Sequence, residues 1–379
     1  KTHNYVYNGD IPALAHQYLD GTLSGEALTK FISLASSQNV ATDASSLTNF
    51  ANDYINVLSQ SYHMGFAVAC VSLIISMLIY VLGRKTFKHV DVNVKQEAEN
   101  NGESSVHVQE LTPAETKSRV VALCLVFAVV IFFWMAFHQN GLTLTYFADE
   151  FTAKSSSGVE SMAFDVFNLV AIIFIVYALF SLFQSKKGRT KTISALVIVL
   201  SCVYLYYRYT TLEGDVAVSA PIFQHFNPFF VVALTPVSLA VFGALAKRGS
   251  EPSAPRKIGI GMFIAALGFT VMALSSMGLP TPNPDGATVV ANDLLVSPSV
   301  LINTYLVLTF AELFLSPMGI SFVSKVAPPK YKGLMMGLWF GATAVGNYLV
   351  SIIGMLWGHM PLWALWSILI VLCLNYSSL

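Results

Sequence analysis

Two side chains that can carry charge lie inside apolar stretches long enough to cross a lipid bilayer. Glu312 stands in FAELFLSPMG, and His138 stands in FFWMAFHQNGLTL. Ionisable groups at membrane depth are energetically expensive and commonly mark a substrate or proton pathway. A carboxylate beside a cavity can bind a substrate ammonium and release it once protonated, and an imidazole with an ordinary pKa of about 6.5 changes charge near neutral pH. The pair indicates cation recognition and proton transfer.

Each of these side chains also has a purely structural interpretation. Glu312 could be a neutral carboxyl that is hydrogen-bonded to a neighbouring helix, because burial disfavours the charged form. His138 could be a neutral imidazole that is bonded to a backbone carbonyl. Both interpretations stay open from the sequence alone.

The neighbours of the two residues favour a functional role. Ser316 lies one turn after Glu312, and Pro317 removes one backbone hydrogen bond and loosens the helix, which predicts a gating element. The side chains around His138 are aromatic or carry amides: Trp134, Gln139 and Asn140. A cluster of this kind is typical of a cavity lining.

Amide side chains in a third stretch could hold the backbone of a peptide. Gln224 and Asn227 are three residues apart and share one helical face, with Pro228 directly after them. The competing interpretation is a helix cap, since Asn before Pro is common at helix boundaries. A further stripe, at four-residue spacing, comprises Trp339, Thr343 and Asn347. Simple helix packing explains that stripe nearly as well.

The composition identifies the elements that must position these residues as membrane helices. The 379 residues are 55% hydrophobic and 11% charged, whereas soluble proteins carry about 25% charged residues. Nine apolar runs are long enough to span a bilayer: 62–83, 119–147, 163–184, 192–208, 222–246, 257–277, 299–324, 333–357 and 361–377. The formal net charge of zero gives no indication of nucleic-acid binding.

The distribution of basic residues orients the helices. If the first run crosses from outside to inside, almost all of the 21 Lys and Arg residues fall in cytoplasmic loops, as the positive-inside rule requires. We therefore expect an extracytoplasmic segment over 1–60 with two short helices, a membrane helix over 61–84, a cytoplasmic linker over 85–118 and a transmembrane bundle over 119–379. Gly333, Gly337 and Gly341 recur every four residues, a spacing typical of closely packed membrane helices.

Four stretches resemble one family, the proton-dependent oligopeptide transporters of the major facilitator superfamily. SYHMGFAVA is similar to the start of its sixth helix, FFWMAFHQNGLTLTYFAD to the seventh and FQHFNPFFVVALTP to the eighth. AELFLSPMGISFVSKVAPPKYKGLMMGLWFGATAVGNYL, the most diagnostic stretch, resembles the tenth and eleventh helices. The resemblance covers about 62–147 and 220–379. It implies a six-helix carboxyl-terminal bundle that is preceded by one further helix.

The resemblance also implies roles for individual residues. Glu312 would receive the peptide amino terminus, and Asn227 and Gln224 would line the peptide site. Aromatic side chains that shape pockets would be Trp134 and Trp339, with Asn347 a weaker cavity candidate. His138 stands where relatives often carry an acid, so imidazole would be the charge-switching group here.

The chain departs from the family pattern in two places. The first five helices, the Glu-x-x-Glu-Arg motif of the first helix and the fourth-helix lysine are not found, so we expect this chain to need an amino-terminal helical half in order to transport. An accessory hairpin over about 160–210 is inserted after the seventh helix, and its end, VYLYYRY, is typical of an interfacial belt on the outer face.

The sequence therefore predicts an all-α polytopic membrane protein. Its expected function is proton-coupled symport of di- and tripeptides across the inner membrane, with residues 1–60 in the periplasm. Alternatives are a related symporter for another amine- or acid-bearing solute, or a receptor or scaffold with the transporter fold. Metal-ligand or catalytic spacings are not found within the spans, and Cys70, Cys124, Cys202 and Cys373 are far apart. We expect no cofactor, no nucleic-acid partner and no enzymatic activity.

Overall fold

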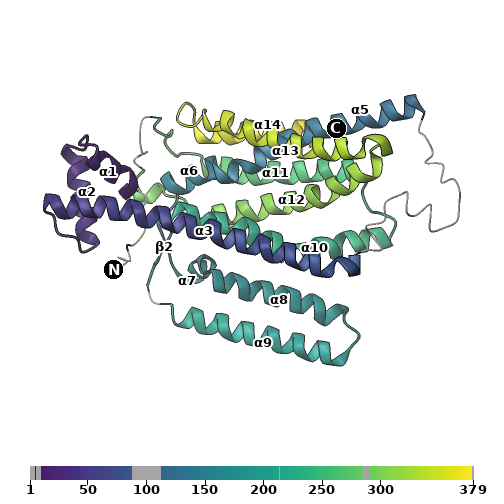
Figure 1. The fold of residues 1–379 in the computed structure, drawn as a ribbon, viewed down its shortest axis with the longest axis horizontal. Coiled ribbons are helices and arrows are strands. Elements are labelled where there is room, and N and C mark those ends of the chain that lie inside the picture. The colour runs from purple at the N-terminus through teal and green to yellow at the C-terminus, as the bar shows by residue number, and fades with distance from the viewer. Residues whose placement is uncertain are drawn as a thin grey trace. The chain divides into compact units, whose positions relative to one another are not determined.

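The protein is an assembly of helices, seen here in a computed structural model (Figure 1). The structure describes residues 5, 10–87, 112–212, 214–284, 288 and 290–377, without the side chains of 10, 85–87, 316–318, 376 and 377. These residues fall into two compact units, Lys1–Gln109 and Glu110–Leu379. The predicted linker over 85–118 lies largely outside the described residues.

The first unit contains a small helical cluster and one very long helix. Its helices are α1 (Asp10–Leu19), α2 (Gly25–Ser37) and α3 (Ala44–Phe87). Leu47, Phe50, Ala51 and Tyr54 of α3 recur at helical spacing and pack with Phe31 of α2 in a buried core. Two short helices were expected before the first span, and both are present. The helix that contains the first predicted span begins at Ala44, well before that span, because this amphipathic stripe extends the helix at its amino-terminal end.

The second unit contains the helices of the carboxyl-terminal bundle. They are α5 (Pro113–Phe137), α6 (Thr143–Glu150), α10 (Phe226–Lys247), α11 (Ala254–Ser275), α12 (Pro298–Val326), α13 (Lys332–Gly354) and α14 (Leu362–Ser377). Among the described residues, eight segments of the chain are long and apolar enough to cross a membrane, and α14 is a shorter apolar helix. Every one of the nine predicted runs is therefore helical.

The predicted helix over 119–147 is broken in two at His138. Its first half starts earlier than expected because Thr112 and Glu115 form a capping box, in which the Thr112 hydroxyl accepts from the Glu115 N–H at 3.3 Å. The helix α5 ends at Phe137, a 3₁₀ turn, η1 (His138–Gly141), follows, and α6 continues the segment. His138 therefore stands at a break and not in mid-helix, where the sequence placed it.

The inserted hairpin consists of α8 (Val166–Gln184) and α9 (Gly188–Thr210). Small buried side chains seven residues apart, Ala171 and Ala178 on α8 and Ser194 and Ser201 on α9, allow the two backbones to approach closely. The α8 helix also packs against α10, where the Tyr177 hydroxyl donates to the Val232 carbonyl at 3.3 Å.

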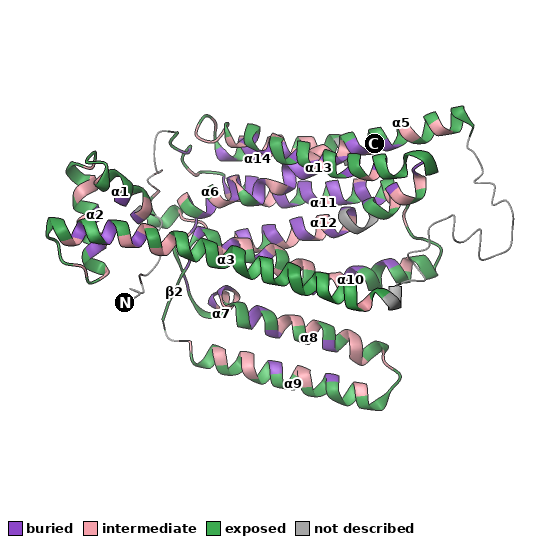
Figure 2. Cartoon of the chain, viewed as in Figure 1, coloured by how far each residue is buried: buried purple, intermediate pink, exposed green. Residues whose placement is uncertain are grey.

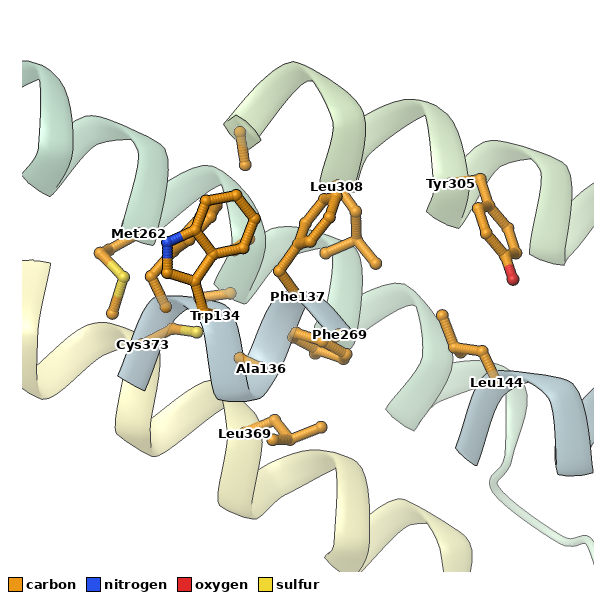
Figure 3. Packing of buried hydrophobic residues seen from close by; sticks show 14 of the residues in the cluster. Trp134, Ala136, Phe137, Leu144, Met262, Phe269, Tyr305, Leu308, Leu369 and Cys373 are labelled. Atoms are coloured by element: carbon orange, nitrogen blue, oxygen red, sulfur yellow. The ribbon is translucent and has the colours of Figure 1, made fainter. Parts of the chain in front are cut away.

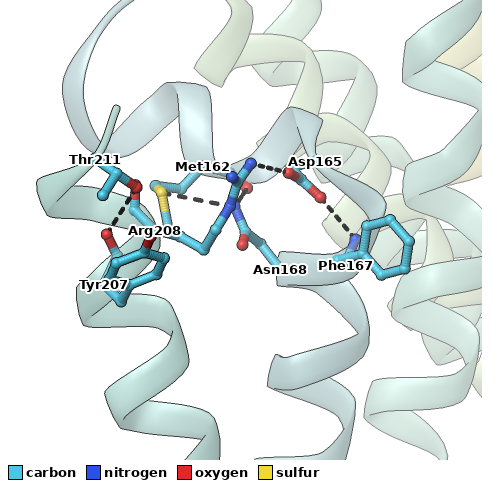
Figure 4. Close-up of polar contacts among 7 residues, drawn as sticks. All are labelled: Met162, Asp165, Phe167, Asn168, Tyr207, Arg208 and Thr211. Carbon is cyan, nitrogen blue, oxygen red and sulfur yellow. Dashed lines mark hydrogen bonds and ion pairs between the residues drawn. The ribbon is translucent and has the colours of Figure 1, made fainter. Parts of the chain in front are cut away.

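Polar contacts close the end of this hairpin where α8 begins and α9 ends (Figure 4). Arg208 of α9 pairs with Asp165, whose second oxygen caps α8 by accepting from the Phe167 N–H at 2.8 Å. Asn168 is 2% exposed and donates to the Met162 carbonyl at 3.0 Å. Short helices α7 (Gly158–Ser161), η2 (Met162–Phe164) and η3 (Ala220–His225), and paired strands β1 (Ser155–Ser156) and β2 (Val216–Ala217), connect the hairpin to the bundle.

The core of the second unit lies between α5, α11, α12 and α14 (Figures 2 and 3). Buried residues face one another there, and the outer faces of the same helices are exposed and apolar. Trp134, Phe137, Phe269 and Leu308 belong to one continuous cluster. One charged side chain, Lys257, is buried in the first turn of α11. Its ammonium lies 4.4 Å from the Phe242 ring centroid and pairs with Glu251.

The amino-terminal end of α12 is held by a carboxylate from α7. Glu160 Oε1 accepts from the Ser299 N–H and the Ser299 hydroxyl, both at 2.6 Å, and from the Ser297 hydroxyl at 2.9 Å. Negative charge at a helix amino terminus is stabilising. Burial alone would raise the pKa of Glu160, but the hydrogen bonds from Ser299 and Ser297 outweigh it and lower that pKa.

Glycine brings α13 against α5 at one position that the four-residue pattern does not include. A Cβ on Gly346 would lie 2.7 Å from the Ile131 carbonyl oxygen and 2.8 Å from the Trp134 Cβ. A Cβ on Gly333, Gly337 or Gly341 would meet no described atom within 4 Å. The same four-residue spacing in Gly354 and Gly358 also predicts close packing, and there it is found: a Cβ on Gly354 would lie 2.5 Å from the Leu142 side chain and one on Gly358 would lie 2.8 Å from the Pro284 backbone. Periodicity alone does not show which of these faces has a neighbour.

Glu160→Gln should weaken the protein in a pH-dependent manner. Loss of the charged cap should reduce the free energy of unfolding by about 1 kcal/mol at neutral pH. The pKa of Glu160 is lower in the folded protein than in the unfolded chain. The wild-type protein is therefore more stable than the variant above the ordinary carboxyl pKa, and this difference disappears as the pH falls through the lowered pKa. Thermal unfolding of both proteins in detergent across pH 3–8 would check this, with Asp149→Asn, in an exposed ion pair with Lys154, as the control. A pH-independent difference would contradict it.

Gly346→Ala should destabilise the bundle by about 1–3 kcal/mol, because the added methyl group forces α5 and α13 apart. Gly341→Ala adds the same methyl group to the same helix in open space and should have little effect. Thermal unfolding of the two variants, followed by tryptophan fluorescence, compares them directly. Equal melting temperatures would show that α13 is not fixed at Gly346.

Candidate functional site

The break between α5 and α6 exposes a backbone carbonyl that three side chains share. The Asn140 carbonyl accepts from Gln224 Nε2 at 2.8 Å, from the Tyr305 hydroxyl at 2.8 Å and from the Thr145 hydroxyl at 3.2 Å. These donors belong to η3, α12 and α6. A single backbone oxygen therefore ties three segments of the bundle together.

The residue before it makes a second set of contacts. Gln139 is fully buried, and its Nε2 donates to the Met135 carbonyl at 3.2 Å and to the Val350 carbonyl of α13 at 3.3 Å. Its Oε1 accepts from the Thr143 hydroxyl at 2.8 Å. The side chain thus satisfies backbone and hydroxyl groups that the helix break would otherwise leave unpaired in an apolar region.

The predicted acid and one predicted amide lie next to each other. Asn227 Nδ2 donates to Glu312 Oε2 at 3.1 Å and to the Thr309 hydroxyl oxygen at 3.1 Å, which joins α10 to α12. Both Asn227 and Glu312 are half-buried. The amide of Asn227 is directed across to another helix, so the capping interpretation does not describe it.

The second amide of this pair is used within the bundle. Besides its bond to the Asn140 carbonyl, Gln224 Nε2 donates to the Thr145 hydroxyl at 2.9 Å. Both contacts hold η3 against the break between α5 and α6. The structure therefore places Gln224 and Asn227 in different clusters, although they are only three residues apart.

The aromatic neighbour of His138 leaves one polar group without a partner. The indole of Trp134 stacks on the His138 ring with centroids 5.1 Å apart, and its edge meets Phe137. Trp134 is 8% exposed, and among the described residues no partner accepts from its buried Nε1–H. His138 is half-buried. This indole N–H is a donor for which a bound molecule could supply an acceptor.

The predicted stripe on α13 separates into unlike environments. Trp339 is 3% exposed and contacts α12 where Gly319 has no side chain, since a Cβ there would lie 2.0 Å from the ring. Thr343 is half-buried, and Asn347 is exposed. The side chains of Ser316 and Pro317, expected to form a gating element, lie outside the described residues.

Sequence reasoning missed two residues of this region. Tyr305 and Thr309 lie on α12, seven and three residues before Glu312, and both are almost completely buried. This spacing places all three on one helical face, a pattern visible in the sequence. The accepting role of the Asn140 carbonyl had no sequence signal, because it depends on where the helix breaks.

The arrangement can recognise a cation and change its own charge. A half-buried carboxylate, an amide, an imidazole and an unpartnered indole N–H lie on α5, α10 and α12 and on the turn after α5. Within the described part of the chain, no group of three or more His, Cys, Asp or Glu side chains could hold a metal ion. The four side chains named here can form hydrogen bonds and exchange protons.

Comparisons with known proteins bear on the family. Residues 201–361 match the model of the POT family. The chain is 36% identical over 160 residues to the peptide transporter YePEPT of Yersinia enterocolitica, covering 40% of this chain and 29% of that protein. It is 26% identical over 315 residues to the uncharacterized transporter YclF of Bacillus subtilis, covering 79% and 56%. Dipeptide and tripeptide permease B of Salmonella typhimurium is 27% identical, covering 51% and 41%. The chain thus spans between roughly a third and a little over half the length of these relatives.

The fold has counterparts among solved structures. A POT family transporter crystallised with 5-aminolevulinic acid superimposes with a TM-score of 0.50 at 14% identity, covering 96% of this chain and 70% of that chain. The expected fold class, an all-α membrane bundle of the major facilitator type with one preceding helix and an inserted hairpin, is confirmed. Residues 201–361 of this multi-pass membrane protein thus match the POT family model, and the chain has a fold that a solved POT family transporter shares.

Proposed function

We propose that these residues form the carboxyl-terminal half of a proton-coupled symporter for di- and tripeptides. The observation that carries the proposal is the contact between Asn227 of α10 and Glu312 of α12, with its 3.1 Å hydrogen bond. An amide beside an ionisable carboxyl can hold a peptide amino terminus while the carboxyl is charged. Protonation of the carboxyl weakens the grip on an ammonium group, which couples release to proton binding.

The other site residues complete the proposed cavity. Trp134 offers its indole N–H to a peptide carbonyl, Trp339 and Asn347 border the side-chain region, and Ser316 and Pro317 form the gating turn of α12. His138 exchanges protons next to Trp134. Gln224 supports the site from η3 and keeps its amide oxygen available to a peptide N–H.

Partners and location follow from the same proposal. The relatives named as peptide transporters are bacterial, which supports the inner membrane with residues 1–60 in the periplasm and 85–118 in the cytoplasm. A midplane site in this superfamily lies between two helical halves. The peptide site is therefore completed by an amino-terminal half, which supplies contacts for the peptide carboxylate.

Glu312→Gln should abolish concentrative uptake of dialanine by the complete polypeptide in liposomes with an inward proton gradient. A charged hydrogen bond contributes about 1.5–3 kcal/mol, so substrate affinity should fall at least tenfold. Wild-type protein should strongly prefer dialanine to N-acetyl-dialanine, and the variant should lose this preference. Asp149→Asn serves as the control. If the wild-type protein takes up another amine under the gradient but not dialanine, that amine becomes the assigned substrate. If it binds a solute but transports none, a receptor function is favoured.

His138→Gln should uncouple transport from the proton gradient while leaving exchange of peptides across the membrane intact. An imidazole can bind and release a proton, whereas the amide cannot. His138→Glu should restore gradient-driven uptake with a more acidic pH optimum, because a carboxyl has the lower ordinary pKa. His225→Gln, at an exposed position, is the matched control. Unchanged coupling in His138→Gln would assign proton exchange to Glu312 alone.

A further inference from the structure

We infer that Thr309 is a positioning residue, which fixes the amide of Asn227 against Glu312 and so decides how tightly the carboxylate is held between substrates. The inference rests on the proposed function for its consequence in transport. Its geometry stands independently, because it concerns a hydrogen-bonded triad that is present without a substrate.

The triad is defined by two equal distances. Asn227 Nδ2 lies 3.1 Å from the Thr309 hydroxyl oxygen and 3.1 Å from Glu312 Oε2. Thr309 is 0% exposed and stands one turn before Glu312 on α12, so the two acceptors lie on the same side of the helix. An amide nitrogen has two hydrogens, and each acceptor takes one.

This double engagement determines which end of the amide is free. With both hydrogens of Asn227 directed to α12, its Oδ1 is left to accept from another group. A peptide ammonium can then donate to Oδ1 and to the Glu312 carboxylate together. Without the Thr309 oxygen, one amide hydrogen loses its acceptor in an apolar setting. The unpaired donor is energetically costly, so rotation of the Asn227 amide away from the carboxylate becomes more favourable.

Among the described residues, no ion pair with the Glu312 carboxylate is found that could hold it in place of Asn227. The titratable side chains on elements packed with α12 are Arg256 and Lys257 on α11, Lys247 on α10, Lys332 and Tyr348 on α13, Glu115, Lys117, Arg119 and Cys124 on α5, His138 on η1, and Tyr146, Asp149 and Glu150 on α6; α12 itself carries Tyr305 and Lys325 besides Glu312. Lys257 is paired with Glu251. The one described hydrogen bond to the Glu312 carboxylate comes from Asn227.

A neighbouring threonine supplies the alternative and the control. Thr304 is also 0% exposed on α12, but its hydroxyl donates to the Val300 carbonyl at 2.9 Å, within its own helix. If Thr309 only fills space in the core, its replacement should have the same effect as replacement of Thr304. Thr309→Val and Thr304→Val remove the same hydroxyl from the same helix without changing its shape.

The test labels Glu312 in the complete polypeptide with dicyclohexylcarbodiimide, a reagent for protonated carboxyls in apolar surroundings, at one pH and without substrate. Mass spectrometry of the fragment that contains Glu312 measures the rate, and Glu312→Gln gives the background. Thr309→Val should be labelled about fivefold faster than wild type, because one supporting hydrogen bond is lost. Thr309→Ser, which keeps the hydroxyl, and Thr304→Val should match wild type.

Transport separates this inference from the proposed function. In proteoliposomes, Thr309→Val should raise the KM for dialanine about fivefold with little change in kcat, and Thr309→Ser should restore it. Equal labelling of Thr309→Val and Thr304→Val would overturn the positioning role. If the wild-type protein transports no dipeptide but Thr309→Val is still labelled faster than wild type, the proposed function is refuted and the positioning role of Thr309 stands.

Discussion

The structure depends on satisfying backbone polar groups where a membrane segment stops being an α-helix. A carbonyl without a partner in hydrocarbon costs several kcal/mol, and the 3₁₀ turn after α5 lies within such a segment. Side chains from η3, α6 and α12 reach the Asn140 carbonyl, and Gln139 bonds to α13. The break is possible because other segments support it, and those segments are in turn fixed by the break.

This mutual support explains why the candidate site is assembled here. The same face of α12 that bonds to the Asn140 carbonyl through Tyr305 carries Thr309 and Glu312 farther along. Fixing one end of that face orients the other. Around it, the core between α5, α11, α12 and α14 is apolar and closely packed, so the polar groups have few alternative arrangements. The positions of the polar side chains in this site are therefore set by the packing of the surrounding helices, and only a few of these side chains can carry charge.

Much of the fold was predictable, because hydropathy and basic residues report directly on membrane helices. All nine runs were located, and the hairpin was recognised as an insertion. The break at His138 was missed because the run was treated as one apolar stretch, although its second half is more polar and opens with His-Gln-Asn-Gly, in which Asn-Gly is a common turn signal. The early start of α3 could have been found from the spacing of Leu47, Phe50 and Tyr54. For the candidate site, residue types indicated Glu312 and Asn227, but their contact depends on how α10 and α12 are packed. The separation of Gln224 from Asn227 likewise depends on the change from η3 to α10 between them.

The first unit has a mechanical consequence. Its helix α3 runs without interruption for 44 residues from the amino-terminal cluster into the membrane-spanning stretch. The part that precedes the apolar run has about 18 residues, a length of about 27 Å at 1.5 Å per residue. A helix of this kind acts as a lever: a tilt of about 10° at the membrane would displace its far end by about 5 Å. The small cluster of α1 and α2 packed on that far end would move with it, so a change in the angle of the helix would become a linear displacement of the cluster.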